Sequence, residues 1–127
     1  MVDMEAIQLN LQQLLQLPEN WDSYGARPIS SVAAEKALAI LERAQHWGDL
    51  TQDTPFIAPL ASGGIQMEWG SPNGQKELLI EVPYSGDKVR YLLVEVDKSG
   101  QEHEREAVVY GLTELDTIMT KLKEKAA

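Results

Sequence analysis

The 127-residue sequence predicts an α+β domain in which an antiparallel β-meander of four to five strands is preceded by two helices and followed by one. Three observations lead to this prediction. Residues 3–47 contain two stretches in which apolar side chains recur at helical spacing. Residues 55–110 form short alternating or apolar stretches separated by turn residues, which is typical of neighbouring antiparallel strands. A third helical stretch ends the chain, and because no linker interrupts the sequence we expect one domain, residues 1–127.

The first predicted helix covers residues 3–16 and has one apolar face. That face consists of Met4, Ile7, Leu11, Leu14 and Leu15. Asp3 is a suitable N-cap. Leu17-Pro18 ends the helix, because the residue before a proline disfavours the helical conformation.

An irregular stretch with two aromatic residues follows at 18–28. Its Asn, Asp and Ser side chains favour hydrogen bonds to the local backbone, and Gly25 can adopt a positive φ angle. We expect a defined turn in which Asp22 accepts hydrogen bonds from nearby amides and Trp21 enters the core.

The other two predicted helices cover residues 31–47 and the chain after Gly111. Ser30 or Ser31 caps the earlier of the two, and Gly48 stops it. In the last helix, Thr113 followed three residues later by Asp116 resembles a capping box.

The strand predicted at residues 63–69 organises the sheet. Its apolar residues alternate with two polar ones, so that one face carries Ile65, Met67 and Trp69 and the other carries Gln66 and Glu68. Gly63-Gly64 opens this strand, and a Gly-Ser-Pro-Asn-Gly turn closes it. Such a strand belongs in the middle of an antiparallel meander.

Four further strands are predicted, at residues 55–60, 77–83, 88–97 and 102–110. The first belongs at an edge, because its two prolines cannot donate ladder hydrogen bonds. The last begins with charged residues, which suit an exposed edge. The strand at 88–97 is apolar on both faces, with Leu92, Val94 and Val96 on one of them. It therefore needs two covers, and a homodimer through the sheet is one way to supply the second.

Charge limits the classes of partner. Twenty acidic residues against eleven basic ones give a net charge of −9, and the basic residues are scattered except for Lys121, Lys123 and Lys125. Direct binding to nucleic acid is therefore unexpected. The negative charge agrees with three other interpretations: it keeps the protein soluble, it attracts a basic protein partner, or it mimics nucleic acid. The sequence has no cysteine, signal-peptide pattern or membrane-spanning apolar run, so we expect a cytoplasmic protein.

Common catalytic motifs are missing from the sequence. It has no phosphate-binding glycine loop, no zinc-ligand cluster and no Gly-x-Ser-x-Gly elbow, so no cofactor or metal is expected. His46 and His103 are the only histidines, and each is most simply a solvated side chain. Enzyme activity is therefore the less favoured interpretation.

Glu68 and Glu81 are the strongest candidates for chemistry. They are expected on one face of neighbouring strands, where two close carboxylates can bind a hard cation or divide acid and base roles. A metal-dependent hydrolase or nuclease is therefore one alternative function. A solvated sheet face with alternating polar residues explains the same pattern without chemistry.

The turn at residues 18–28 supplies a second candidate surface. Trp21, Asp22, Tyr24 and Arg27 combine rigid rings with a carboxylate and a planar guanidinium. Aromatic rings and guanidinium groups dominate binding hot spots. The alternative is a turn whose residues only anchor the fold.

Motifs within residues 17–83 are similar to those of a group of small, uncharacterised bacterial proteins. These share an Asn-Trp-Asp-Ser-Tyr-Gly-Ala turn, a Pro-x-Ile-x-Pro segment and a Gly-Gly-Ile-Gln-x-Glu-Trp strand. The matching positions include Asp22, Gly25, Gly63, Gly64, Gln66, Glu68 and Trp69. The resemblance implies no reaction. By analogy it implies an accessory or antitoxin-like partner protein.

The sequence thus favours a small acidic interaction module that binds another protein through the turn and the polar sheet face. The candidate binding residues are Trp21, Asp22, Tyr24, Arg27, Gln66, Glu68 and Glu81. From the resemblance we expect the turn to pack over the start of the 63–69 strand and to bring Asp22 or Tyr24 near Gln66 and Glu68. The alternatives are the metal-dependent hydrolase and an acidic nucleic-acid mimic, which predicts carboxylates arrayed on one surface.

Overall fold

The computed structural model describes residues 3–71 and 73–126 and confirms the predicted α+β arrangement. Its helices are α1 (Met4–Leu15), α2 (Ser31–Ala44) and α3 (Leu112–Ala126), with a 3-10 turn at Asp49–Thr51. Its strands are β1 (Phe56–Pro59), β2 (Ile65–Gly70), β3 (Lys76–Val82), β4 (Val89–Val96) and β5 (Glu102–Val109).

The five strands form an antiparallel meander in the order β1-β2-β3-β4-β5. The register runs straight across the sheet, since Glu68 of β2 lies opposite Leu79 of β3, which lies opposite Leu92 of β4. β1 and β5 are the edges, as the two prolines and the charged residues predict. β4 is paired on both sides, as its apolar composition predicts.

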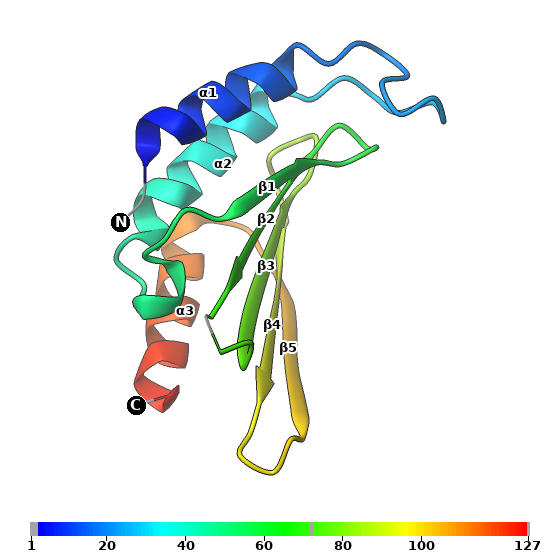
Figure 1. Ribbon diagram of the computed structural model, residues 1–127. Helices are drawn as coiled ribbons and strands as arrows, with labels where there is room; N and C mark the ends of the chain where they lie inside the picture. The colour runs from blue at the N-terminus through cyan, green and yellow to red at the C-terminus, as the bar shows by residue number, and fades with distance from the viewer. Residues whose placement is uncertain (1–2, 72, 127) are drawn as a thin grey trace.

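All three helices lie on one side of the sheet (Figure 1). α2 is the central helix, because it contacts β2 and β3 below it and both α1 and α3 beside it. α3 also contacts β5, the strand from which the chain leads into it. Within the described residues, no helix is long and apolar enough to cross a membrane.

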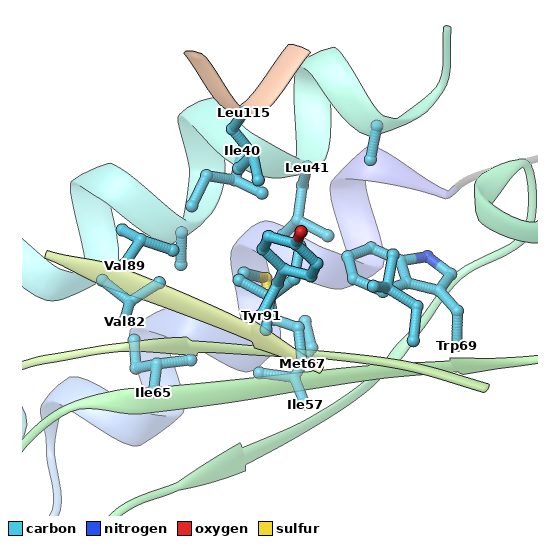
Figure 2. Close-up of a cluster of buried hydrophobic side chains, with 14 of the residues drawn as sticks. Ile40, Leu41, Ile57, Ile65, Met67, Trp69, Val82, Val89, Tyr91 and Leu115 are labelled. Atoms are coloured by element: carbon cyan, nitrogen blue, oxygen red, sulfur yellow. The ribbon is translucent and has the colours of Figure 1, made fainter. Parts of the chain in front are cut away.

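The core lies between α2 and the sheet (Figure 2). Ile40 and Leu41 extend from α2 toward the strands, where Met67 and Tyr91 are buried beneath them. Alanines at four other α2 positions, Ala33, Ala34, Ala37 and Ala44, are also buried. Short side chains on this face let the helix lie close to the sheet.

Asp3 and Ser30 cap the first two helices, as predicted. The Asp3 carboxylate accepts from the Ala6 amide (3.0 Å), and the Ser30 hydroxyl accepts from the Ala33 amide (3.2 Å). The predicted end of the second helix was wrong by three residues, since α2 stops at Ala44. The chain leaves the helix there so that Trp47 can turn into the core.

The predicted Thr113–Asp116 capping box was also wrong. α3 already begins at Leu112, and Asp116 faces α2 instead of its own helix terminus. There it accepts a hydrogen bond from the indole Nε1 of Trp47 (2.9 Å) and pairs with Arg43. Tertiary contacts between helices therefore outweighed the local capping pattern.

Trp21 does not enter the core, contrary to the prediction. It is half-buried, and its indole Nε1 donates to the backbone oxygen of Arg27 (2.8 Å) within the turn. The core tryptophans are Trp47 and Trp69, both buried. The Trp21 indole instead joins the two ends of its own turn through the hydrogen bond to Arg27.

Candidate functional site

The sheet has one covered face and one face without a helix. Along β3 and β4 buried residues alternate with half-exposed ones, so Leu78 and Leu93 point toward the helices while Leu79 and Leu92 point away. We call the side that points away from the helices the open face (Figure 1). Its position is set by the strand register and by the placement of all three helices opposite it.

An apolar stripe crosses the open face. It consists of Phe56 on β1, Leu79 on β3, and Leu92 and Val94 on β4. Phe56 is 67% exposed, and the other three are half-buried with no described element above them. The stripe lines a shallow hollow of about 440 Å³, which Glu68 and Glu77 also border. Apolar side chains that gather in such a hollow typically mark a contact surface.

Carboxylates border the apolar stripe, and one of them, Glu68, lies within it between Phe56 and Leu79. The strand register places the following acids on the open face: Glu68, Glu77, Glu81, Glu102, Glu104 and Glu106. In the five strands, all of which the structure describes, Arg90 is the one basic residue on this face. The open face is therefore strongly acidic.

Arg90 is already neutralised by its neighbours. Its guanidinium lies between two carboxylates, 2.6 Å from Glu106 and 3.3 Å from Glu81. The hydrogen bond to Glu106, and the charge of that carboxylate, raise the pKa of Arg90 above its ordinary value. The cation thus stays charged and engaged, and it offers little attraction to an acidic ligand.

Gln66, Glu68 and Glu81 lie together on the open face. The Gln66 amide donates to the Glu68 carboxylate (2.9 Å), and Gln66 stands directly opposite Glu81 across the ladder. Glu68 and Glu81 are diagonal neighbours, a relation in which Cβ atoms lie about 7 Å apart. Each carboxylate has its own partner, Gln66 for one and Arg90 for the other.

The described side chains contain no group of three or more His, Asp or Glu residues able to hold a metal ion. At Glu81, a cation would compete with the guanidinium of Arg90 at 3.3 Å. The carboxylates are arranged as a charged border instead of converging on one point. Such a border concentrates negative charge on one surface of the sheet.

The turn at 18–28 is ordered by hydrogen bonds between its side chains and its own backbone. Asp22 accepts from the amides of Tyr24 (2.8 Å) and Ala26 (3.1 Å), as predicted. Asn20 and Ser23 adopt positive φ angles of 63° and 66°, a conformation that only a well-bonded loop retains. Tyr24, in the same turn, is 91% exposed.

The turn packs against the start of β2. The Arg27 amide donates to the carbonyl of Ala61 (2.9 Å), and the Arg27 guanidinium lies 3.7 Å from the ring centroid of Tyr84. Gly63 faces that same tyrosine ring and has a φ of 91°. A side chain there is disfavoured both by the contact with the ring and by the backbone conformation. Gly64 lies against the carbonyl oxygen of Val82 and also has no room for a Cβ atom. The two glycines thus permit the turn, β2 and β3 to meet.

The turn and the open face are separate in their bonding. Across the described part of the chain, Asp22 bonds only within the turn, and Glu68 bonds to Gln66. No hydrogen bond among these residues joins Asp22 or Tyr24 to the polar pair on β2. The predicted binding residues are therefore described as two groups, those of the turn and those of the open face.

The two histidines lie outside both groups. His46 is exposed just after the end of α2. His103 lies on β5 and meets the Asp97 carboxylate (2.9 Å) at the exposed β4–β5 hairpin. Asp97 also accepts from Ser99 and Gln101, and these bonds hold its pKa well below the usual range for aspartate.

Sequence reasoning assigned the polar residues of the open face and noted that Leu92 and Val94 need a second cover, but it did not join them with Leu79 and Phe56. The signal was present, because residues 88–97 carry apolar side chains on both faces of their strand and Leu79 lies on the same face as Glu77 and Glu81. The alternation also predicted helices on one face of the sheet, but it could not give whether another part of the chain covers the opposite face. Once all three lie on one side, Leu79 and Leu92 are left without a cover.

The fold and site define a class: a small α+β domain with a one-sided helical layer and an acidic open sheet face that has an apolar centre. No family model, curated protein or solved structure matches the chain. The similarity to the bacterial group thus rests on the quoted motifs alone, and function must be inferred from the geometry.

Proposed function

We propose that this protein is a non-enzymatic binding module whose working surface is the open face. The single observation that carries the proposal is the apolar stripe on a sheet face that no described element covers. Leu79 and Leu92 lie side by side there, and their burial against a partner would remove apolar surface from water. A cytoplasmic location and an accessory role beside a partner protein belong to the same proposal.

A nucleic-acid mimic is the second candidate, because the carboxylates of the open face form one array as that hypothesis predicts. The two candidates differ in what they require of the apolar stripe. A mimic acts through charge, so Leu79 and Leu92 contribute little to its binding. A binding module loses affinity when these two leucines become polar.

The metal-dependent hydrolase has no such supporting observation, since Glu68 and Glu81 each have another partner. It nevertheless makes a distinct prediction. A divalent cation that raised the Tm of the wild-type protein, and not that of Glu68→Gln, would favour it.

The test is affinity capture with matched variants. Immobilised wild-type protein, Leu79→Thr/Leu92→Thr and Tyr24→Ser are each exposed to lysate of the organism that encodes the protein. Tyr24→Ser is the control for the turn, because it removes a side chain that is 91% exposed. Circular dichroism and urea unfolding establish that both variants are folded.

The expected result is a protein that wild type and Tyr24→Ser retain and that Leu79→Thr/Leu92→Thr loses. The purified partner should then form a defined complex with the wild-type protein in sedimentation velocity. Capture of the same proteins by the folded double variant would overturn the proposal. Loss of the partner only with Tyr24→Ser would transfer the function to the turn.

A further inference from the structure

We infer that the open face binds a basic amphipathic α-helix of the partner, one whose aliphatic stripe meets Leu79 and Leu92 and whose lysines or arginines meet the surrounding glutamates. This inference rests on the proposed function and adds the chemistry of the partner. It follows from three properties of the open face: its charge, the condition of the sheet edges and the length of the apolar stripe.

Charge selects the sign of the partner. Glu77 and Glu104 flank Val94 in one row of the sheet, and Glu68 and Glu106 flank Leu79 and Leu92 in the next row. The single cation, Arg90, is held between Glu81 and Glu106. Lysines or arginines along both sides of an aliphatic stripe would complement this border. An acidic peptide, an anionic membrane or nucleic acid would be repelled by it.

The same charge argues against a second copy of this chain as the occupant. Two open faces stacked on each other would bring the glutamates of one copy against those of the other, with each Arg90 already paired. Like charges brought together at an interface oppose association. A homodimer through the sheet, which β4 first suggested, is therefore less favourable than a basic partner.

We take the partner element to be a helix, because a single strand is disfavoured both on the open face and at the edges of the sheet. A single strand laid on a sheet face would leave its own backbone groups unpaired, whereas a helix satisfies them internally. Strand addition would have to occur at an edge. β1 is preceded by Pro55 and ends with Pro59, and β5 carries charges along Glu102–Glu106. A helix on the open face would complete a helix–sheet–helix sandwich.

The apolar stripe has a length that a short helix can cover. Phe56 and Leu92 lie in one register row, three strand spacings apart, which corresponds to about 14 Å, and Glu68 stands between Phe56 and Leu79 in that row. Three helical turns span about 16 Å. Leucines spaced three and four residues apart on such a helix would therefore reach from β1 to β4.

The experiment uses three synthetic helical peptides of about 18 residues each. The lysine peptide has a leucine stripe flanked by lysines, the glutamate peptide has the same stripe flanked by glutamates, and the shuffled peptide has the lysine composition without a stripe. Binding to the full-length protein is measured by fluorescence anisotropy at about 50 mM and about 300 mM salt.

Two variant pairs separate charge from apolar contact. Leu79→Thr/Leu92→Thr removes the centre of the stripe. Glu77→Gln/Glu104→Gln removes two border charges, and Glu35→Gln/Glu42→Gln removes the same charge from exposed positions on α2 as its control.

We expect the lysine peptide to bind at least about tenfold more tightly than the other two peptides, and to lose at least about fivefold in affinity on going to high salt. Leu79→Thr/Leu92→Thr should weaken it about tenfold and Glu77→Gln/Glu104→Gln about fivefold, while the α2 control stays within about twofold.

Several results would overturn the inference. Equal binding of the shuffled peptide would show that charge alone acts, and equal binding of the glutamate peptide would show that the border selects nothing. A wild-type dimer that Leu79→Thr/Leu92→Thr dissolves would make a second copy the occupant. In these cases the lysate partner can still depend on Leu79 and Leu92. Failure of the proposed function gives a different result: Leu79→Thr/Leu92→Thr then captures the lysate partner as well as the wild type does.

Discussion

Leu79 of β3 and Leu92 of β4 lie directly opposite each other on the face of the sheet that carries no helix, each beside a leucine that points into the core. Each of the two strands therefore has one leucine on the core face and a neighbouring leucine on the open face, so the two environments can be compared within one strand. This relationship underlies the proposed function and yields a direct test of the fold.

Leu93→Ala should lower the free energy of unfolding by about 2–5 kcal/mol, because Leu93 is buried and its removal leaves a cavity beneath the helices. Leu92→Thr should lower it by less than about 1 kcal/mol, because its neighbourhood on the open face is half solvent. Urea unfolding followed by tryptophan fluorescence measures both. Equal losses would show that something in the monomer covers the open face.

Gly64→Ala should destabilise the protein by about 2–3 kcal/mol, because the added methyl group meets the carbonyl oxygen of Val82 and forces β2 from β3. Gly70→Ala in the same strand is the control. A Cβ there would meet only the carbonyl oxygen of Lys76 at 4.0 Å, an ordinary contact, so stability should stay within about 1 kcal/mol of the wild type. Thermal unfolding of the two variants side by side checks the difference, and similar losses at both would contradict the close approach.

Asp116→Ala should cost about 1–3 kcal/mol, because it leaves the buried indole N–H of Trp47 without its acceptor. Asp116→Asn keeps an acceptor and loses only the partly exposed ion pair with Arg43, so it should cost less than about 1 kcal/mol. Urea unfolding compares the variants. If Asn proved as costly as Ala, the ion pair and not the indole bond would hold α3 to α2.

Acid should weaken the β4–β5 hairpin through Asp97. Hydrogen bonds from Ser99, His103 and Gln101 hold the pKa of folded Asp97 below its usual value of 3.8. The unfolded chain therefore binds a proton more readily. The contribution of this residue to stability is complete above about pH 5, and it declines as the pH falls through the usual range of aspartate toward the folded pKa.

Asp97→Asn, which retains an oxygen to accept from the Ser99 and Gln101 amides, should remove that part of the acid dependence. The measurement is the urea midpoint at pH 6 and at pH 3 for both proteins. The wild type should lose more stability than the variant between these two values. Identical losses would mean that Asp97 is not a source of acid sensitivity.

The sequence predicted the elements well because their signals are local. Asp3 and Ser30 are caps whose bonds lie within three residues, and the alternation of Ile65 to Trp69 records which face of β2 is buried. The meander followed from short turns between successive strands. Local chemistry also placed the Asp22 bonds correctly.

Features that depend on packing between distant segments were not predictable in the same way. Trp47 entered the core where helix periodicity continued α2 through it, and Asp116 joined Trp47 across 69 residues of chain instead of capping α3. Trp21 stayed in its own turn because the Arg27 carbonyl supplied its indole with an acceptor. Leu79 and Leu92 are likewise uncovered because all three helices pack on the opposite face, and the apolar residues on both faces of β4 could not tell what covers the second face.

Methyl NMR with the lysine peptide tests the central claim, that the open face is the docking surface, most directly. Titration into methyl-labelled protein should shift the resonances of Leu79, Leu92 and Val94 while those of Leu9 and Val32 stay in place. These two control residues are also exposed, by 57% and 50%, but lie on α1 and α2. Shifts confined to Leu9 or Val32, with the open-face methyl groups unchanged, would contradict the claim.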